Sequence, residues 1–303
     1  MKKIGIILAI ILMAAAIRAE TSGEYGMQVL KLIVSADEAA MGGTGAFYAN
    51  HAARFVSNPA AANLDKFQAL SFNQNYWIFD TTINSLNYLK SSGKSSFGIG
   101  YRYLDYGALP GATDDGQLTG DFYPMDLVVS AGAAYRLSPN HFVGANLNGL
   151  YQKIDIESAL GGSLDLGYRY LSPLRGIELA AALKNLGKTG KLGDEDIKLP
   201  LSAEFSLIAK ELNRYLALDD LKLSSELKIV QHIDNDELEA NLGLKALVHP
   251  NFSLKSGYVL NHDIKSWSAG FGLRMKRILV DYAFLPISGE IDDVHMIQLT
   301  YRF

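Results

Sequence analysis

The sequence predicts an all-β protein, a single transmembrane antiparallel β-barrel of about 14 strands. Three observations support this fold class. Apolar and polar residues alternate with a period of two from Phe67 to the C-terminus, the chain begins with an export signal, and short and long connections alternate between the expected strands.

The export signal occupies residues 1–19. Lys2 and Lys3 precede an apolar run from Ile4 to Ala16, and small residues follow as far as Ala19, the order typical of a secretory signal peptide. We expect cleavage after Ala19, with Ala16 as the alternative site. The run is short for a bilayer span, so an uncleaved N-terminal anchor is the less favoured interpretation.

Composition agrees with an exported β protein. The chain has 303 residues, of which 49% are apolar and 20% charged, and its 28 Gly, 16 Tyr and 13 Phe outnumber its 8 Pro, which favours strands and tight turns. The absence of cysteine excludes disulfides and thiolate sites. Without residues 1–19 the chain carries 25 basic and 32 acidic residues, a net charge of about −7, which argues against nucleic acid as a partner.

The alternation is clearest in WSAGFGLRM, residues 267–275, where bulky apolar side chains share one face and small or charged ones share the other. Fourteen segments show it: 67–77, 81–90, 95–106, 121–136, 141–154, 157–171, 176–185, 198–209, 219–231, 236–248, 251–260, 265–275, 277–285 and 293–303. Most are long enough to cross a membrane at a tilt, and an even number closes an antiparallel barrel. A soluble β-sandwich is the alternative. A helical membrane protein is excluded, because residues 20–303 contain no apolar run of about twenty residues.

Connection lengths and aromatic positions favour the barrel over the sandwich. With a periplasmic N-terminus, five of the six inner connections are short turns such as LSPN and VHPN, whereas the outer connections are longer and acidic. Tyrosine, tryptophan and phenylalanine gather at the expected strand ends, where a membrane interface would place them.

Several stretches resemble chemical motifs without their required context. Residues 182–189 end in a Gly-Lys-Thr, but the glycines and acids that follow preclude the helix of a phosphate-binding loop. Gly43 and Gly45 begin a dinucleotide-like pattern that lacks its third glycine and its crossover unit. The six histidines are dispersed and are expected in solvated turns. We therefore predict no catalytic residue, no metal, no cofactor and no enzymatic activity.

Charges of both signs are expected to face the lumen. They are Arg102, Asp165, Arg169, Glu178, Lys184, Glu204, Glu226, Lys228, Glu239, Lys245, Lys255, Arg274, Asp281 and Arg302. A selective pore would need a ring of one character, so we favour a cross-strand network that fills and rigidifies the interior.

The stretch AAMGGTGAFYANHAARFVSNPAA, residues 39–61, fits neither helix nor strand. With its neighbours, residues 29–64, it resembles the N-terminal signature of the PorV/PorQ family of outer-membrane barrels, which are related to the FadL group. The matching residues are Leu30, Lys31, Met41, Gly42, Gly43, Ala46, Phe47, Asn58, Pro59 and Ala60. Asp37 and Glu38 stand where that family prefers an arginine, and Ala61 where it usually has a glycine.

The resemblance implies a barrel in the outer membrane of a diderm bacterium, with an N-terminal plug or hatch that enters the lumen from the periplasm. We expect residues 1–19 to form the signal peptide, 20–66 the plug and 67–303 the barrel, with Phe47, Tyr48 and Phe55 filling space. The final Tyr301 and Phe303 look like the signal that the barrel-insertion machinery reads.

The same resemblance implies a protein-binding component of type IX secretion, whose partners would be secretion-system proteins or secreted cargo besides outer-membrane lipid. The alternative is a FadL-like transporter of small hydrophobic compounds such as long-chain fatty acids. Transport needs an apolar pocket and usually a gap in the wall, which Gly107, Pro110 and Gly111 after the third strand would provide. A structural barrel without transport is the third possibility.

Overall fold

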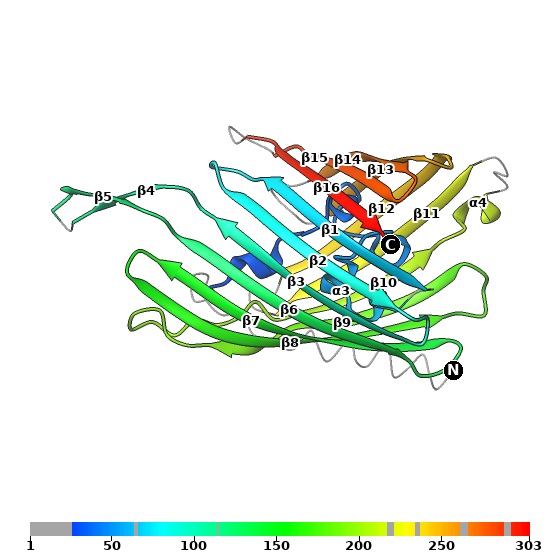
Figure 1. The fold of residues 1–303 in the computed structure, drawn as a ribbon, viewed down its shortest axis with the longest axis horizontal. Coiled ribbons are helices and arrows are strands. Elements are labelled where there is room, and N and C mark those ends of the chain that lie inside the picture. Colours follow the sequence, from blue (N-terminus) through cyan, green and yellow to red (C-terminus); the bar gives the residue numbers. More distant parts are fainter. Residues whose placement is uncertain are drawn as a thin grey trace.

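The computed structural model describes residues 26–63, 66–113, 115–216, 221–233, 237–260, 266–287 and 292–303, and in it fourteen strands close one antiparallel barrel (Figure 1). Each strand pairs with its neighbours in the chain, and β1 closes the ring against β16. The barrel strands are β1 (Phe67–Tyr76), β2 (Thr82–Ser91), β3 (Ser95–Asp105), β6 (Met125–Arg136), β7 (His141–Ile154), β8 (Glu157–Leu171), β9 (Ile177–Thr189), β10 (Ser202–Ala209), β11 (Lys222–His232), β12 (Glu237–His249), β13 (Phe252–Leu260), β14 (Trp267–Met275), β15 (Ile278–Leu285) and β16 (Val294–Arg302). The predicted fold class is confirmed.

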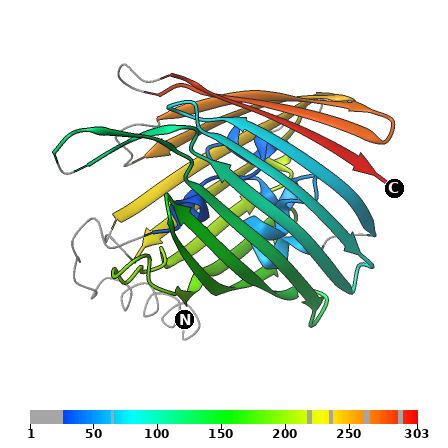
Figure 2. The ribbon, with the colours of Figure 1, turned by 60° about the vertical axis from the view of Figure 1, so that its left-hand side comes forward.

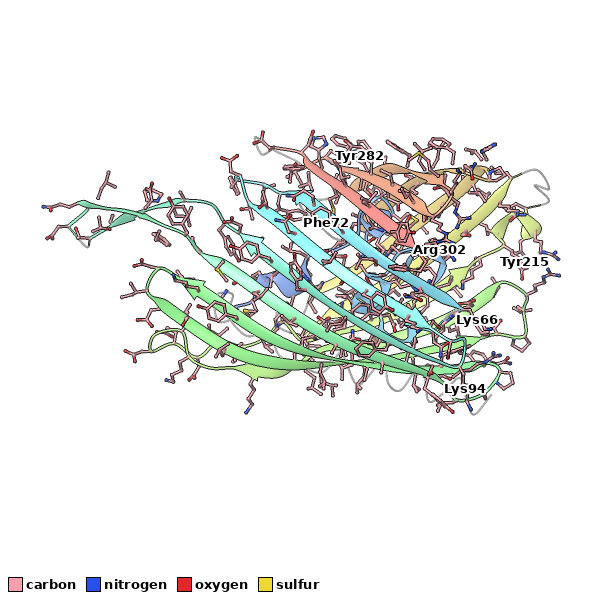
Figure 3. All side chains as sticks on the ribbon, in the orientation of Figure 1. Lys66, Phe72, Lys94, Tyr215, Tyr282 and Arg302 are labelled. Atoms are coloured by element: carbon pink, nitrogen blue, oxygen red, sulfur yellow. The ribbon has the colours of Figure 1, made fainter. Side chains whose placement is uncertain are left out.

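The wall is apolar outside and polar inside, the reverse of a soluble β-sandwich. On β1, Asn73 and Asn75 face inward and are fully buried, whereas Phe72 faces outward and is 41% exposed (Figure 3 labels Phe72). Outward side chains can be apolar because lipid covers them, and inward ones must find hydrogen-bond partners. Among the described residues, no helix is long and apolar enough to cross a membrane.

The two ends of the barrel differ. At the inner end, where β1 begins and β16 ends, the turns are short apart from residues 210–221, which include α4 (Leu212–Tyr215). Lys66, Lys94, Tyr215 and Arg302 mark this end in Figure 3. At the outer end, β4 (Leu109–Ala112) and β5 (Leu118–Phe122) form a hairpin that projects beyond the wall (Figures 1 and 2).

Two sequence expectations about the wall are wrong. We expected one strand over residues 121–136. The structure instead ends β5 at Phe122 and begins β6 at Met125, with Tyr123 and Pro124 between them. The glycines after β3 loosen nothing in the barrel, because β3 pairs with β6 up to Asp105 and Met125 and Gly107 lies beyond that pairing. Pro110 and Gly111 belong to the projecting hairpin instead.

Residues 26–63, called here the lumenal segment, run inside the barrel (Figure 2). Short helical turns form it: η1 (Gln28–Lys31), α2 (Ala36–Ala39), η2 (Ala46–Tyr48), α3 (Arg54–Ser57) and η3 (Pro59–Ala62). The segment spans the lumen from one end to the other. The Gly26 amide donates to Lys198 O (3.2 Å) at the outer end, and Asn63 Nδ2 donates to Lys94 O (2.8 Å) at the inner end. The predicted signal peptide, residues 1–19, lies outside the described residues.

Candidate functional site

The lumenal segment rests against wall glycines at three places. Gly243, Gly257 and Gly270 on β12 to β14 receive Ala40 to Thr44, Gly98 and Gly132 receive the Phe55 ring, and Gly144 and Gly167 receive Pro59 and Ala60. A Cβ on Gly98 or Gly132 would come within 2.8 Å of the Phe55 ring, and one on Gly144 or Gly167 would come equally close to the Ala60 amide. Glycine is needed at these places because a Cβ would overlap backbone or ring atoms of the segment.

Eight of the ten residues that carry the family resemblance, all except Leu30 and Lys31, lie in these contacts or next to them. Met41, Gly42, Gly43, Ala46, Phe47, Pro59 and Ala60 are buried inside the barrel, and Asn58 is 5% exposed. Asn58 caps η3, accepting from the Ala60 amide (2.9 Å) and donating to Ala181 O of the wall (3.1 Å). Gly42 and Gly43 have φ of 65° and 82°, a left-handed backbone that suits glycine.

A buried ionic cluster joins the middle of the segment to β12, β13 and β15. Asp37 Oδ1 lies 3.1 Å from Lys245 Nζ and 2.5 Å from Lys255 Nζ, and Lys255 Nζ is also 2.5 Å from Asp281 Oδ1. The side chains of Asp37 and Lys255 are almost completely shielded from solvent. A buried carboxylate is tolerated only when it is paired, so this cluster fixes α2 to one side of the wall.

Arginines of the wall hold the two ends of the segment. Arg102 of β3 donates to the carbonyls of Val29 and Leu32 near the outer end. Arg169 of β8 makes a two-point ion pair with Glu178 (2.8 and 3.0 Å) and donates to Asn63 O (3.1 Å) near the inner end. The predicted network of lumenal charges therefore exists, and much of it is directed at the segment rather than only across strands.

Two groups of the segment are held in their neutral forms by burial. Burial raises the pKa of Glu38 to about 8 and lowers the pKa of His51 to about 3. Asp37 behaves differently: burial alone would raise its pKa, but Lys245 and Lys255 together hold that pKa well below its ordinary range. Sequence reasoning placed His51 in a solvated turn, whereas it is 1% exposed and its Nε2 lies 3.0 Å from Ser35 Oγ.

These pKa shifts predict how docking of the segment depends on pH. Stability from protonated Glu38 is fully present below its ordinary pKa of 4.5 and is lost as pH rises towards about 8. Stability from neutral His51 is present above 6.5 and is lost as pH falls towards about 3. The two slopes cancel between 4.5 and 6.5, so the melting temperature should fall between pH 6.5 and 8.

Replacing Glu38 with glutamine should remove this fall, because the amide does not ionise. Thermal melting of the detergent-solubilised protein at several pH values measures it. The exposed Glu157→Gln variant is the control and should keep the wild-type profile. A Glu38→Gln profile that still declines above pH 6.5 would show that another group controls docking.

A cavity of about 230 Å³ lies between the segment and the wall formed by β9 to β12. The segment contributes apolar Leu30, Leu32, Ile33, Val34 and Val56, together with polar Lys31, Glu38 and Ser57. The wall contributes polar Arg102, Lys184, Asn185, Ser202, Glu204, Lys228, His232, Glu237, Glu239, Asn241 and Ser268, together with apolar Val230, Val259, Trp267 and Leu285. The segment therefore leaves space on this side of the lumen.

The wall beside the cavity is interrupted. β9 pairs with β8 out to Thr189, but its pairing with β10 stops at Lys184 and Ser202. Residues 197–201 turn inward instead: Pro200 O accepts from Asn185 Nδ2 (2.8 Å), and buried Leu199 packs with Met27. Pro200 has no N–H to give a strand ladder. The break lies between β9 and β10, not after β3 as the glycines there had indicated.

A bulge accompanies the break. Lys184 and Asn185 together oppose Asp165 of β8, Asn185 has a φ of 64°, and its amide donates to Asp165 Oδ1 (2.8 Å). The stretch that resembled a phosphate-binding loop, residues 182–189, is thus the outer part of strand β9. No helix follows it in the described residues up to Ala209, so it cannot hold phosphate as that motif does.

The last residues of the chain lie at the inner end of the barrel. The Phe303 amide donates to Gln68 O (3.1 Å), and the Phe303 ring, 60% exposed, packs edge-on against Tyr301 with 5.1 Å between the ring centres.

We predict that deleting Phe303 lowers the folded, heat-modifiable fraction in outer membranes several-fold, because the terminal aromatic is the expected assembly signal. Phe79→Ala, which removes another exposed ring, should assemble normally. Equal assembly of the two variants would remove Tyr301 and Phe303 from that role.

No family profile and no curated protein matches this sequence. Solved structures do match. The toluene transporter TbuX of Ralstonia pickettii superposes with a TM-score of 0.61 and 15% identity, covering 88% of this chain and 96% of that one. The fold is that of the FadL-type outer-membrane barrels.

Two further structures agree with it. The toluene transporter TodX of Pseudomonas putida has a TM-score of 0.62 with 12% identity, covering 89% of this chain and 98% of that one. A FadL homologue of Pseudomonas aeruginosa has a TM-score of 0.58 with 11% identity, covering 88% and 98%. The likeness establishes the fold, and the apolar outer surface fits a barrel that spans a membrane. It supports the FadL side of the sequence resemblance and leaves the PorV/PorQ assignment a prediction.

Proposed function

We propose that the protein is a non-enzymatic outer-membrane channel through which small, largely apolar molecules pass beside a seated lumenal segment. The observation that carries this proposal is the cavity between the segment and β9 to β12, at the place where the β9 and β10 ladder stops. Molecules entering from the outer end would meet the cavity, and the interruption beside it offers a way through the wall. The likeness to structures described as toluene transporters supports the same function.

The size of the cavity limits the cargo. A protein cavity of about 150 Å³ holds benzene, so about 230 Å³ suits one ring with a short substituent. A long-chain fatty acid exceeds what this space encloses. We therefore favour ring-sized molecules over the long-chain acids expected from the sequence.

The lumenal segment acts as the plug in this proposal. It is attached to the wall through the wall glycines and through the ion pairs of Asp37, and its residues 39–61 are almost entirely buried. Displacing the segment would separate Asp37 from Lys255 and break this buried ion pair. Passage beside the segment needs no such step.

Uptake of a labelled monoaromatic hydrocarbon, ethylbenzene, by cells carrying the protein in an outer membrane without other such channels tests the function. Val230→Trp places a ring in the cavity and should reduce uptake to about the level of cells without the protein. Val248→Trp, on the lipid-facing side of β12, is the matched control. Ser202→Phe obstructs the same space and covers the case in which Val230→Trp fails to fold. Uptake that no obstruction alters would disprove the cavity route.

A role in type IX secretion is the second candidate, favoured by the resemblance of residues 29–64 to the PorV/PorQ signature. The hairpin of β4 and β5 offers a surface for a protein partner, because Leu109 and Leu118 are exposed on it (39% and 80%). Crosslinking in cells should then recover secreted proteins with a common C-terminal domain. Recovery of none, together with ethylbenzene uptake, would leave the channel function alone.

A further inference from the structure

Two tyrosine–histidine pairs lie on the lipid-facing surface of the described strands, one near each end of the barrel. At the inner end, His141 Nδ1 at the start of β7 lies 2.6 Å from Tyr168 OH of β8. At the outer end, His295 Nδ1 at the start of β16 lies 2.8 Å from Tyr282 OH of β15 (Figure 3 labels Tyr282). The two pairs have the same chemistry, but their surroundings carry opposite charges.

Cations surround the inner pair. Tyr135 of β6 faces lipid opposite Val143, one outward position along β7 from His141. Lys94, in the turn between β2 and β3, holds its Nζ 5.6 Å from the centre of the Tyr135 ring. Lys90 points outward from β2 and is exposed. We call this set the inner patch: Lys90, Lys94, Tyr135, His141 and Tyr168.

No carboxylate offsets these cations on the neighbouring wall. Residues 82–104 and 127–154, all of them described, contain no aspartate or glutamate. Asp165 of β8 faces the lumen, where it accepts from Asn148 Nδ2 (3.0 Å). The outer pair differs, because exposed Asp292 and Asp293 come directly before β16, close to His295 in the chain. The inner patch is therefore a site of positive charge at the edge of the wall, and the outer pair is not.

The inner patch has the donors that a phosphate group binds. Its two ammonium groups supply charge and N–H donors, and Tyr135 supplies an O–H. Tyrosine rings at a strand end lie at the level of the lipid headgroups, and the long aliphatic stem of Lys90 lets its ammonium reach that level. Exposed Phe97, Ile99 and Val129 continue the surface toward the middle of the membrane, where acyl chains pack.

We infer that the inner patch binds the headgroup of an anionic glycerophospholipid in the leaflet at the inner end of the barrel. The patch opens toward lipid rather than toward the lumen, so a membrane lipid reaches both its cations and the apolar wall beside them. A soluble phosphate lacks the apolar contacts. The inference is independent of the cavity and of the molecules that pass through it.

Lipid retention by the purified full-length protein tests the inference. The protein is mixed in detergent with equal amounts of phosphatidylglycerol and phosphatidylcholine and purified again, and the retained lipids are quantified. The wild type should retain the anionic lipid in excess. Lys90→Gln and Lys94→Gln should each lower that excess about fivefold, the contribution of one basic residue near an anionic surface. Tyr168→Phe should lower it as well, because the His141 ring loses its hydrogen-bond partner.

Two variants are matched controls. Lys222→Gln removes the same charge at the inner end of β11, and Tyr282→Phe breaks the outer pair. Both should retain lipid like the wild type. A wild type without excess of the anionic lipid would overturn the inference. So would a Lys222→Gln variant that loses as much of the excess as Lys94→Gln, because the charge of the whole rim would then be responsible. Displacement of the lipid by excess glycerol phosphate would also overturn it, because the patch would then be a site for soluble phosphate.

Discussion

Replacing Gly257 with valine is expected to unseat the lumenal segment and convert the closed barrel into an ion-conducting pore. A Cβ at this position would overlap the amide nitrogen of Gly42 and the carbonyl carbon of Met41. The obstacle is backbone, which cannot rotate away as a side chain can, so the cost should reach the upper part of the range of about 1–3 kcal/mol typical of overpacking. Gly42 cannot easily adapt, because its φ of 65° already fixes a tight turn.

Planar-bilayer recordings measure this effect. Wild-type protein should show little steady conductance, and Gly257→Val should show conductance several-fold higher. Gly149→Val is the matched control. Gly149 lies on the barrel wall, and the nearest atom to a Cβ added there would be Val129 O, 3.9 Å away. A folded Gly257→Val barrel that stays closed would mean that the segment does not depend on this contact.

The second large effect is expected from Asp37→Asn. The substitution removes the charge that faces Lys245 at 3.1 Å and Lys255 at 2.5 Å. It leaves these two lysines with Asp281, 2.5 Å from Lys255 Nζ, as the remaining carboxylate of the cluster, in a site where the Lys255 side chain is 0% exposed. Breaking a buried ion pair from one side costs about 3–5 kcal/mol. The temperature of the heat-induced gel-mobility shift should fall on the order of 10 °C.

Arg175→Gln is the control for that experiment. Arg175 pairs with Glu211 at 3.3 Å, but its side chain is 70% exposed, and such surface pairs contribute at most about 1 kcal/mol. Its gel-shift temperature should stay close to that of the wild type. If Asp37→Asn melts like Arg175→Gln, the buried cluster does not hold the segment.

The sequence was sufficient to predict the barrel because strand alternation is a local property. Inward asparagines and serines at every second position of β1, opposite outward Leu70 and Phe72, can be read from seven consecutive residues. The strand number and the lumenal position of residues 39–61 were predicted in the same way, from local pattern and from resemblance. The boundary between β5 and β6 was missed because the segment expected over 121–136 included only Asp121 and Phe122 of β5 and continued into β6.

The site could not be predicted because it depends on contacts between distant residues. Asp37 meets Lys245 across 208 positions, and nothing local distinguishes it from a solvated aspartate. The one sign in the sequence was the pair of acids at 37 and 38, where the PorV/PorQ family prefers an arginine. The ion pairs of Asp37 with Lys245 of β12 and Lys255 of β13 account for the acid at position 37. The break between β9 and β10 likewise depends on where residues 197–201 pack, which the pattern of each strand does not record.

The most direct test of the channel account asks whether small molecules pass while the lumenal segment is fixed to the wall. The chain contains no cysteine, so Ala52→Cys with Ser71→Cys introduces a single possible disulfide at a place where the Ala52 amide lies 2.7 Å from Ser71 Oγ. Ethylbenzene uptake by cells carrying the oxidised double variant should equal uptake after reduction. Uptake that is abolished by oxidation and restored by reductant would show that the segment must move, and would contradict passage beside a seated plug.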